Sequence, residues 1–287
     1  VVDPRYSRSA AQADIYARIR PGTDLAFYGG LINYILSNNL YQKEYMLHYT
    51  NAACLLTDDY KFDPEKGLFS GWDPETKTYS NASWGYDVAK HLQWDTSEGS
   101  AFAWVNRPGT PEFKTPDLKV LKRDMTLTDP HCVLNILKKH YARYTPELVQ
   151  RITGMDPDVM KKVWEVYAST GARDKAGSIL CALGQTQHSY GSQNCRAMCM
   201  VQLLLGNVGI AGGGINALRG EPNVQGSTDV GVSSHQAPGY LSWPTGKSHP
   251  TLAAYLSKET YAGGYYSNKP KFWVSALKEW FGENATK

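Results

Sequence analysis

The segment from residue 212 to residue 226 constrains the fold of this chain more than any other stretch. It reads GGGINALRGEPNVQG, and its five glycines tolerate positive φ and allow another molecule to approach the main chain closely. The pattern predicts a backbone that is neither regular helix nor regular strand. Arg219, the one cationic residue of the segment, offers a planar, permanently charged fork that suits a carboxylate or a phosphate. The alternative is a surface turn with a solvated arginine.

The residues before this segment predict an α/β sheet. Residues 177–184, GSILCALG, form a short apolar run typical of a buried strand, and a polar loop separates them from a helical pattern over residues 195–205. Strand, loop and helix in that order are half of a βαβ unit. Within the helix, Cys195 and Cys199 are predicted to be small buried hydrophobic residues. The sequence therefore predicts a layered α/β domain.

Helical patterns dominate much of the remaining chain. A broad apolar face begins at Thr23, and a second helical stretch lies near residues 42–47. Three further helices start at a capping residue followed by proline, at Asp129-Pro130, Thr145-Pro146 and Asp156-Pro157. An amphipathic helix is predicted over residues 272–281.

Residues 57–125 have a different character. They are crowded with Asp-Pro and Gly turns and with Trp and Tyr, which predicts an ordered, aromatic-rich insertion; no internal repeat is apparent. We therefore predict one α/β domain over residues 1–218 that contains this insertion. Residues 219–287 are predicted to be the start of a second α/β domain.

Composition limits the classes of partner. The net charge is +3, from 30 basic and 27 acidic residues without a basic block, which argues against nucleic acid. No apolar run approaches the ~20 residues of a membrane-spanning helix, so we expect no span in this chain. The five cysteines contain no C-x-x-C pair, so we predict neither a zinc nor an iron–sulfur site here. The chain starts without Met, in what reads as the end of a strand, and we interpret it as an internal fragment.

Candidate ligand-binding residues follow the predicted strands, because ligands of open α/β sheets bind beyond the carboxyl ends of the strands. Asp3 and Arg5 follow the first strand, where a carboxylate can bind ribose hydroxyls and an arginine can pair with a phosphate. Gly22, Thr23 and Asp24 then open a helix whose free N–H groups favour anions. The Asp24 carboxylate can accept the N–H donors of a guanine edge; its alternative role is that of a helix N-cap.

The second strand end carries the sequence LGQTQHSYG over residues 183–191. Its amides, hydroxyls and histidine suit a flat heterocycle with many polar atoms, such as a pterin; a solvated polar loop is the alternative. The chain has neither a Walker loop nor a G-x-G-x-x-G motif, so ATP and NAD lack their usual sequence support.

Taken in order, these motifs resemble the molybdenum or tungsten bis-pterin oxidoreductases of the dimethyl sulfoxide reductase superfamily, and within it the catalytic (alpha) subunits of formate dehydrogenases. The most specific matches are residues 184–189 and the stretches 218–220 and 223–226. The resemblance covers essentially the whole chain. It implies Rossmann-like αβα layers around a parallel sheet, within a multidomain molybdopterin oxidoreductase fold.

The resemblance also implies a cofactor, a bis(molybdopterin guanine dinucleotide) that holds Mo or W, and roles toward it. The residues placed at the guanosine and diphosphate are Asp3, Arg5, Gly22, Thr23 and Asp24. The residues facing a pterin are Leu183, Gly184, Gln187 and His188. Gly220 and Glu221 would touch the cofactor, although Glu221 stands where relatives often carry another polar residue.

Two residues are implied in the reaction itself. Arg219 matches the family's arginine beside the metal, which binds formate and aims its C–H bond at a ligand of the metal. His235, sixteen positions further on, is a candidate proton relay or substrate contact; a solvated loop histidine is the alternative. The implied reaction is the two-electron oxidation of formate to carbon dioxide, with electrons passing through iron–sulfur clusters to an electron-transfer (beta) subunit. The implied location is the periplasm.

Parts of the family's pattern are expected outside this sequence. The metal-ligating cysteine or selenocysteine belongs upstream of Asp3, together with a domain that holds a 4Fe-4S cluster, so we predict no metal ligand in this chain. Two other functions stay open: a related bis-pterin enzyme acting on nitrate or another oxo acceptor, and a non-catalytic respiratory subunit of the same fold. Arg219 favours formate over the first, and the set Asp24, Gln187 and Arg219 argues against the second.

Overall fold

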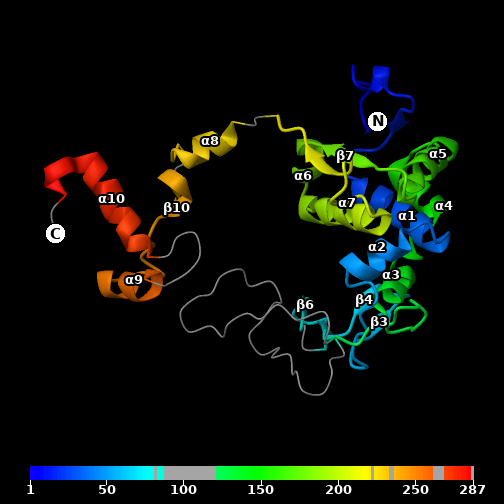
Figure 1. Cartoon of the computed structure of the whole chain (residues 1–287), viewed down its shortest axis with the longest axis horizontal. Helices are drawn as coiled ribbons and strands as arrows, with labels where there is room; N and C mark the ends of the chain where they lie inside the picture. The colour runs from blue at the N-terminus through cyan, green and yellow to red at the C-terminus, as the bar shows by residue number, and fades with distance from the viewer. Residues whose placement is uncertain (81–82, 87–120, 221–222, 233–235, 261–267, 286–287) are drawn as a thin grey trace. The chain divides into compact units, whose positions relative to one another are not determined.

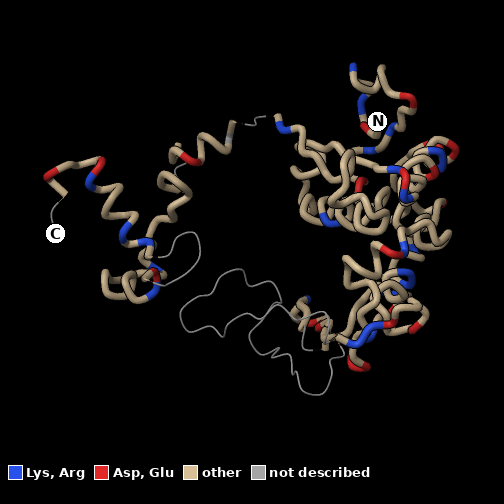
Figure 2. The backbone as a smooth tube through the Cα atoms, viewed as in Figure 1, with Lys and Arg blue, Asp and Glu red and all other residues tan. Residues whose placement is uncertain are grey.

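The computed structural model describes residues 1–80, 83–86, 121–220, 223–232, 236–260 and 268–285 (Figure 1). Contacts divide the chain into two units. Among the described residues, unit 1 comprises residues 1–80, 83–86 and 121–220, and unit 2 comprises residues 223–232, 236–260 and 268–285. Basic and acidic residues are interspersed along the described parts (Figure 2).

The core of unit 1 is built around one helix, α1 (Asp24–Ser37). Its side chains Leu31, Ile32, Ile35 and Leu36 are at most 3% exposed. Around it pack the helices α3 (Val133–Tyr141), α4 (Pro146–Thr153), α5 (Pro157–Ala168) and α7 (Gly191–Leu205). The aromatic ring of Trp164 lies so close to α1 that a Cβ at Gly30 would come within 2.5 Å of it. Glycine at this position therefore permits the helix contact.

Local signals confirm two of the three predicted helix starts; at the third, α3 begins only at Val133, with Cys132 rather than Asp129 at the N-cap position. Thr145 caps α4 because its Oγ1 accepts a hydrogen bond from the backbone N–H of Leu148, and Asp156 caps α5 through the N–H groups of Asp158 and Val159. The second predicted helical stretch is α2 (Lys43–Tyr49). The short 3-10 helices of unit 1 are η1 (Ala10–Gln12) and η2 (Ser169–Gly171).

Two pairs of parallel strands confirm the α/β class. Strand β1 (Val2–Asp3) pairs with β2 (Ala17–Arg18), and β7 (Ser178–Cys181) pairs with β8 (Gly214–Ala217). The connection between β7 and β8 runs through α6 (Leu183–Thr186) and α7, which completes the predicted βαβ unit. The carboxyl ends of β7 and β8 therefore lie side by side, with Cys181 opposite Ala217.

Three expectations about this unit were wrong. The glycine-rich segment contains the regular strand β8, because its backbone pairs with β7 and the buried Gln202 amide donates a hydrogen bond to the carbonyl of Gly214. Strand β7 is not fully buried, since Leu180 is 61% exposed. Cys199 is exposed and Cys195 is only half-buried, because the face of α7 that packs on the core is formed by Met198, Val201 and Leu205.

The described part of the insertion forms two tandem hairpins with the same ten-residue pattern. Residues 61–70 read KFDPEKGLFS and residues 71–80 read GWDPETKTYS. The hairpins consist of β3 (Phe62–Asp63), β4 (Leu68–Phe69), β5 (Trp72–Asp73) and β6 (Thr78–Tyr79). In each turn the aspartate carboxylate accepts hydrogen bonds from the backbone two and three residues on. An internal repeat is thus present, and the ring of Phe69 stacks on His140 of α3.

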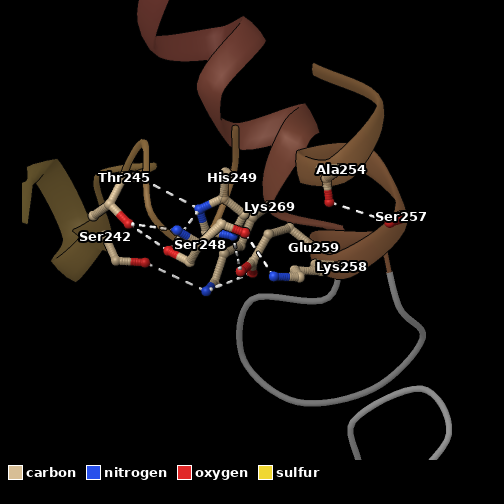
Figure 3. Close-up of polar contacts among 9 residues, drawn as sticks. All are labelled: Ser242, Thr245, Ser248, His249, Ala254, Ser257, Lys258, Glu259 and Lys269. Atoms are coloured by element: carbon tan, nitrogen blue, oxygen red, sulfur yellow. Dashed lines mark hydrogen bonds and ion pairs between the residues drawn. The ribbon is translucent and has the colours of Figure 1, made fainter. Parts of the chain in front are cut away.

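Unit 2 contains the helices α8 (Val224–Asp229), α9 (Leu252–Glu259) and α10 (Lys269–Phe281), which includes the predicted terminal helix. Its strands β9 (Gln236–Ala237) and β10 (Leu241–Ser242) are antiparallel, and its 3-10 helices are η3 (Pro238–Tyr240) and η4 (Gly282–Asn284). Glu259 joins His249 at 3.1 Å and Lys269 at 2.7 Å, which links the end of α9 to the start of α10 (Figure 3).

The contacts with Lys269 and His249 lower the pKa of the Glu259 carboxyl. Burial alone would raise the pKa of Glu259, but its hydrogen bond to Lys269, the positive charge there and His249 hold that pKa below its usual value. Among the described residues, no helix is both long enough and apolar enough to span a membrane.

Candidate functional site

Two segments far apart in the sequence meet at the start of α1. The side-chain amide of Gln185 donates a hydrogen bond from Nε2 to Oδ1 of Asp24 at 2.8 Å. The ring Nε2 of His188 lies 3.9 Å from Oδ2 of the same carboxylate. The hydroxyl of Tyr190 donates to the backbone carbonyl of Gly22. We call these five residues, Gly22, Asp24, Gln185, His188 and Tyr190, the carboxylate cluster.

The packing of α1 against α7 produces this meeting. The start of α1 carries Asp24, and the loop that leads into α7 carries His188 and Tyr190. The rings of His188 and Tyr190 are stacked, with centroids 5.8 Å apart and planes 9° apart. The predicted ligand-binding residues at the start of α1 and those that follow β7 are therefore adjacent in space.

Asp24 is not a helix cap. Thr23 occupies the N-cap position, and its hydroxyl donates to the carbonyl of Arg20 rather than accepting from the helix. The carboxylate of Asp24 instead faces Gln185 and His188 and is only 13% exposed. Burial, and next the nearby Asp24 charge, raise the pKa of Tyr28 one turn further along α1. The alternative role of Asp24 as a mere N-cap is thus ruled out.

The predicted polar loop after β7 begins as a helical turn. Residues Leu183–Thr186 form α6, held from α7 by the buried Asn194, whose Nδ2 donates to the carbonyl of Gln185 at 3.0 Å. Gly191 allows this close approach, since a Cβ there would lie 2.1 Å from the carbonyl oxygen of Thr186. This tertiary hydrogen bond and the close packing override the loop signal of the polar residues.

The pterin-facing candidates lie around α6 with different exposures. Leu183, Gly184 and Gln187 are exposed, whereas His188 is half-buried. A Cβ built on Gly184 would meet nothing within 4 Å, so its backbone is open to an approaching molecule. It is Gln185, and not Gln187, whose side chain bonds Asp24.

Arg219 lies just beyond the carboxyl end of β8. The backbone N–H of Leu218 donates to the carbonyl of Cys181 at 2.7 Å, which continues the strand pairing almost to the arginine. Arg219 has a φ of 57° and an exposed side chain. A Cβ on Gly220 would lie 3.7 Å from Cδ1 of Leu183, so the arginine segment and α6 are neighbours.

The remaining candidates are placed differently. Asp3 accepts a hydrogen bond at Oδ1 from the backbone N–H of Arg5 at 2.7 Å, and the Arg5 side chain is exposed. Within the described part of the chain, neither residue hydrogen-bonds to the carboxylate cluster. Glu221 and His235 lie outside the described residues.

The cluster offers recognition chemistry rather than metal ligands. No group of three or more His, Cys, Asp or Glu side chains suited to a metal ion occurs in the described part of the chain. Two further residues of the segment after β7, Gln185 and Tyr190, belong to the site, although the sequence alone does not distinguish them from their polar neighbours. Their importance depends on contacts with α1 across more than 160 residues, for which a single sequence carries no signal.

The sequence and fold of this chain are those of a molybdopterin oxidoreductase. The family model described as Molybdopterin oxidoreductase matches residues 1–268, and the chain belongs to this family. Among curated proteins, it is 46% identical to "Formate dehydrogenase, nitrate-inducible, major subunit" of Escherichia coli (strain K12), over 100% of this chain and 26% of that protein.

Two further curated relatives have similar identity. "Formate dehydrogenase 2 subunit alpha (cytochrome c-553)" of Nitratidesulfovibrio vulgaris is 43% identical over 99% of this chain and 26% of its own length. "Formate dehydrogenase subunit alpha" of Megalodesulfovibrio gigas is 42% identical over 96% of this chain and 25% of its own. The chain thus spans about a quarter of these relatives. Among solved structures, "Acetylene Hydratase from Pelobacter acetylenicus" has a TM-score of 0.40 and 19% identity, over 74% of this chain and 17% of that one, which supports no functional conclusion.

The residues present fit a pterin cofactor. The amide oxygen Oε1 of Gln185 is buried without a hydrogen-bond partner among the described residues, next to the Asp24 carboxylate. Acceptors of this kind match the amino and ring N–H donors that pterin and guanine share. The open backbone at Gly184 and the cationic Arg219 lie at the neighbouring strand ends.

Proposed function

We propose that this chain is part of the catalytic subunit of a formate dehydrogenase, which oxidises formate to carbon dioxide, two electrons and a proton. The observation that carries the proposal is its 46% identity, over its whole length, to a formate dehydrogenase major subunit. The bound group would be a bis(molybdopterin guanine dinucleotide) with Mo or W, which supplies the two-electron redox chemistry. The protein supplies binding, orientation and electrostatics.

The carboxylate cluster would hold the guanine end of one dinucleotide. Asp24 accepts the N–H donors of the base, and Gly22 and Thr23 lie just before α1, whose free N–H groups favour anions. Asp3 and Arg5 bind at the ribose and diphosphate. Facing a pterin are Leu183, Gly184, Gln187 and His188, and touching the cofactor nearer the metal are Gly220 and Glu221.

Arg219 would bind the substrate. Its guanidinium forms a bidentate pair with the formate carboxylate and so orients the C–H bond. Arg219 is exposed beside α6, at the sheet edge where the parallel strands β7 and β8 both end, and this position supports the role. His235 would accept or relay the proton that formate oxidation releases.

The longer protein would supply the remaining parts. We infer that a cysteine or selenocysteine of another segment ligates the metal, and that electrons leave through a 4Fe-4S cluster to an iron–sulfur beta subunit. We also infer a periplasmic location and a role in anaerobic respiratory electron transport, as in the family resemblance.

The test is formate-dependent dye reduction by the full-length protein, with metal and pterin measured on the same sample. We expect turnover that scales with the content of Mo or W. A protein filled with metal and pterin that reduces nitrate but leaves formate unchanged would refute the proposal. A protein purified from a cofactor-competent host without pterin would identify a non-catalytic relative instead.

A further inference from the structure

Gln185 links the two halves of the carboxylate cluster. Its Nε2 lies 2.8 Å from Oδ1 of Asp24, and the two residues are 161 positions apart. The other carboxylate oxygen lies 3.9 Å from Nε2 of His188, so both oxygens of Asp24 face residues of one segment. The orientation of this carboxylate thus depends on where α6 and its following loop are held.

The position of Gln185 is itself determined by buried contacts. Its backbone carbonyl accepts a hydrogen bond from Asn194, which is 0% exposed, and its N–H donates to the carbonyl of Ala182. The close contact between Gly191 and Thr186 fixes α6 against α7. The Gln185 side chain therefore extends from a rigid turn toward Asp24.

The chemistry of the amide sets its orientation. An amide oxygen placed against the carboxylate would be repelled, so Nε2 faces Asp24 and Oε1 points away from it. Among the described residues Oε1 has no hydrogen-bond partner, although it is buried. A buried acceptor without a donor is costly, and a ligand with N–H groups beside Asp24 relieves that cost.

We propose that Gln185 is a positioning residue for cofactor binding. Its amide holds the Asp24 carboxylate toward the amino-substituted heterocycle of the guanine dinucleotide, and its Oε1 provides a further acceptor for the same ring. This inference rests on the proposed function, because it presupposes that a pterin guanine dinucleotide binds at the start of α1. It adds a residue outside the set that the family resemblance assigns.

The test compares three variants of the full-length protein. Gln185→Ala removes the amide, Gln185→Glu keeps its shape but repels Asp24 at neutral pH, and Gln193→Ala removes an exposed glutamine on α7 as the control. The first readout is GMP released by acid hydrolysis per mole of protein after dialysis. The second is the thermal midpoint of apoprotein from a host that cannot make the cofactor.

We expect Gln185→Ala to retain the dinucleotide about tenfold less well than the control, the effect of losing one hydrogen bond to a charged group. Its apoprotein should melt close to the control, because removal of the buried, unpaired Oε1 offsets the loss of the bond to Asp24. Retention by Gln185→Glu should be poor at neutral pH and recover at mildly acid pH, because a protonated carboxyl can again donate to Asp24. A purely structural role would show the same pH recovery in the apoprotein midpoint as in retention.

Two results would overturn the positioning role alone: full GMP retention in Gln185→Ala, or an apoprotein midpoint that falls in step with retention. In both, the wild-type protein carries GMP and the proposed function stands. Wild-type protein without GMP or pterin would instead overturn the proposed function, and this inference with it.

Discussion

Replacing Gln202 with leucine should weaken the pairing of β7 and β8, the two strands that carry the site. Gln202 is 0% exposed on α7, and its Nε2 donates to the carbonyls of Gly177 at 2.8 Å and Gly214 at 2.6 Å. Its Oε1 accepts from the Tyr167 hydroxyl at 2.8 Å and from Asn207 at 3.3 Å. One side chain thus bridges the beginnings of β7 and β8.

The expected cost follows from the partners that remain. Gln202→Leu keeps the volume but leaves the two carbonyls and the tyrosine hydroxyl without this partner, at about 1–3 kcal/mol for each group that stays unsatisfied. Burial of the added apolar surface offsets part of this. We expect the free energy of unfolding to fall by about 2–4 kcal/mol, which corresponds to a thermal midpoint lowered by about 5–15 °C.

The assay is denaturant unfolding of the apoprotein, with amide hydrogen exchange measured in β7 and β8. Exchange in both strands should accelerate, because they lose a shared anchor. Gln193→Leu, exposed on the same helix, is the matched control and should change stability by less than about 0.5 kcal/mol. Equal stability and equal strand exchange for Gln202→Leu and this control would refute the reasoning.

Three further predictions test the site and the packing. Arg219→Lys should impair formate turnover more than cofactor content, since a point charge replaces a bidentate fork. Asp24→Ala should instead lose cofactor first. Assays of metal, GMP and turnover on the same samples distinguish the two outcomes. Gly30→Ala should lower the free energy of unfolding by about 1–3 kcal/mol, because its Cβ would lie 2.5 Å from the Trp164 ring, and an unchanged denaturant midpoint would contradict this. Burial, and then a neighbouring arginine, lower the pKa of His140 from 6.5 to about 4, so the neutral ring contributes stability above pH 6.5 that is lost as the pH falls toward 4. The wild-type midpoint should therefore drop more steeply over that range than that of His140→Phe.

The sequence predicted the elements whose signals are local. Thr145 and Asp156 precede prolines and cap α4 and α5 as expected, because a capping oxygen and a fixed φ act within three residues. The tandem hairpins also have a local signal, the repeated pattern of an aromatic residue followed by Asp-Pro-Glu. This repeat was not predicted, because the many other turns and aromatic residues of the insertion do not share it. The order of strand, polar loop and helix over residues 177–205 predicted the α/β class, although the returning strand β8 was not predicted.

The parts that could not be predicted depend on distant partners. Strand β8 forms in a glycine-rich segment because β7 and the Gln202 amide supply hydrogen bonds from other parts of the chain. The selection of Gln185 over Gln187 depends on Asn194 and the close approach at Gly191. Sequence composition identified a polar segment, but only packing shows which amide reaches Asp24.

The strand character of β8 also changes the physical interpretation of Arg219. A loop of glycines would leave the guanidinium free to sample many positions, at an entropic cost on binding. Instead the strand pairing continues to Leu218, and Arg219 itself adopts a φ of 57°, a conformation that costs a non-glycine residue energy. Such strain persists only where the surrounding structure over-determines it. The backbone that carries Arg219 is therefore held at the end of a paired strand next to α6, and under the proposed function this restricts the positions from which its guanidinium can bind a small carboxylate.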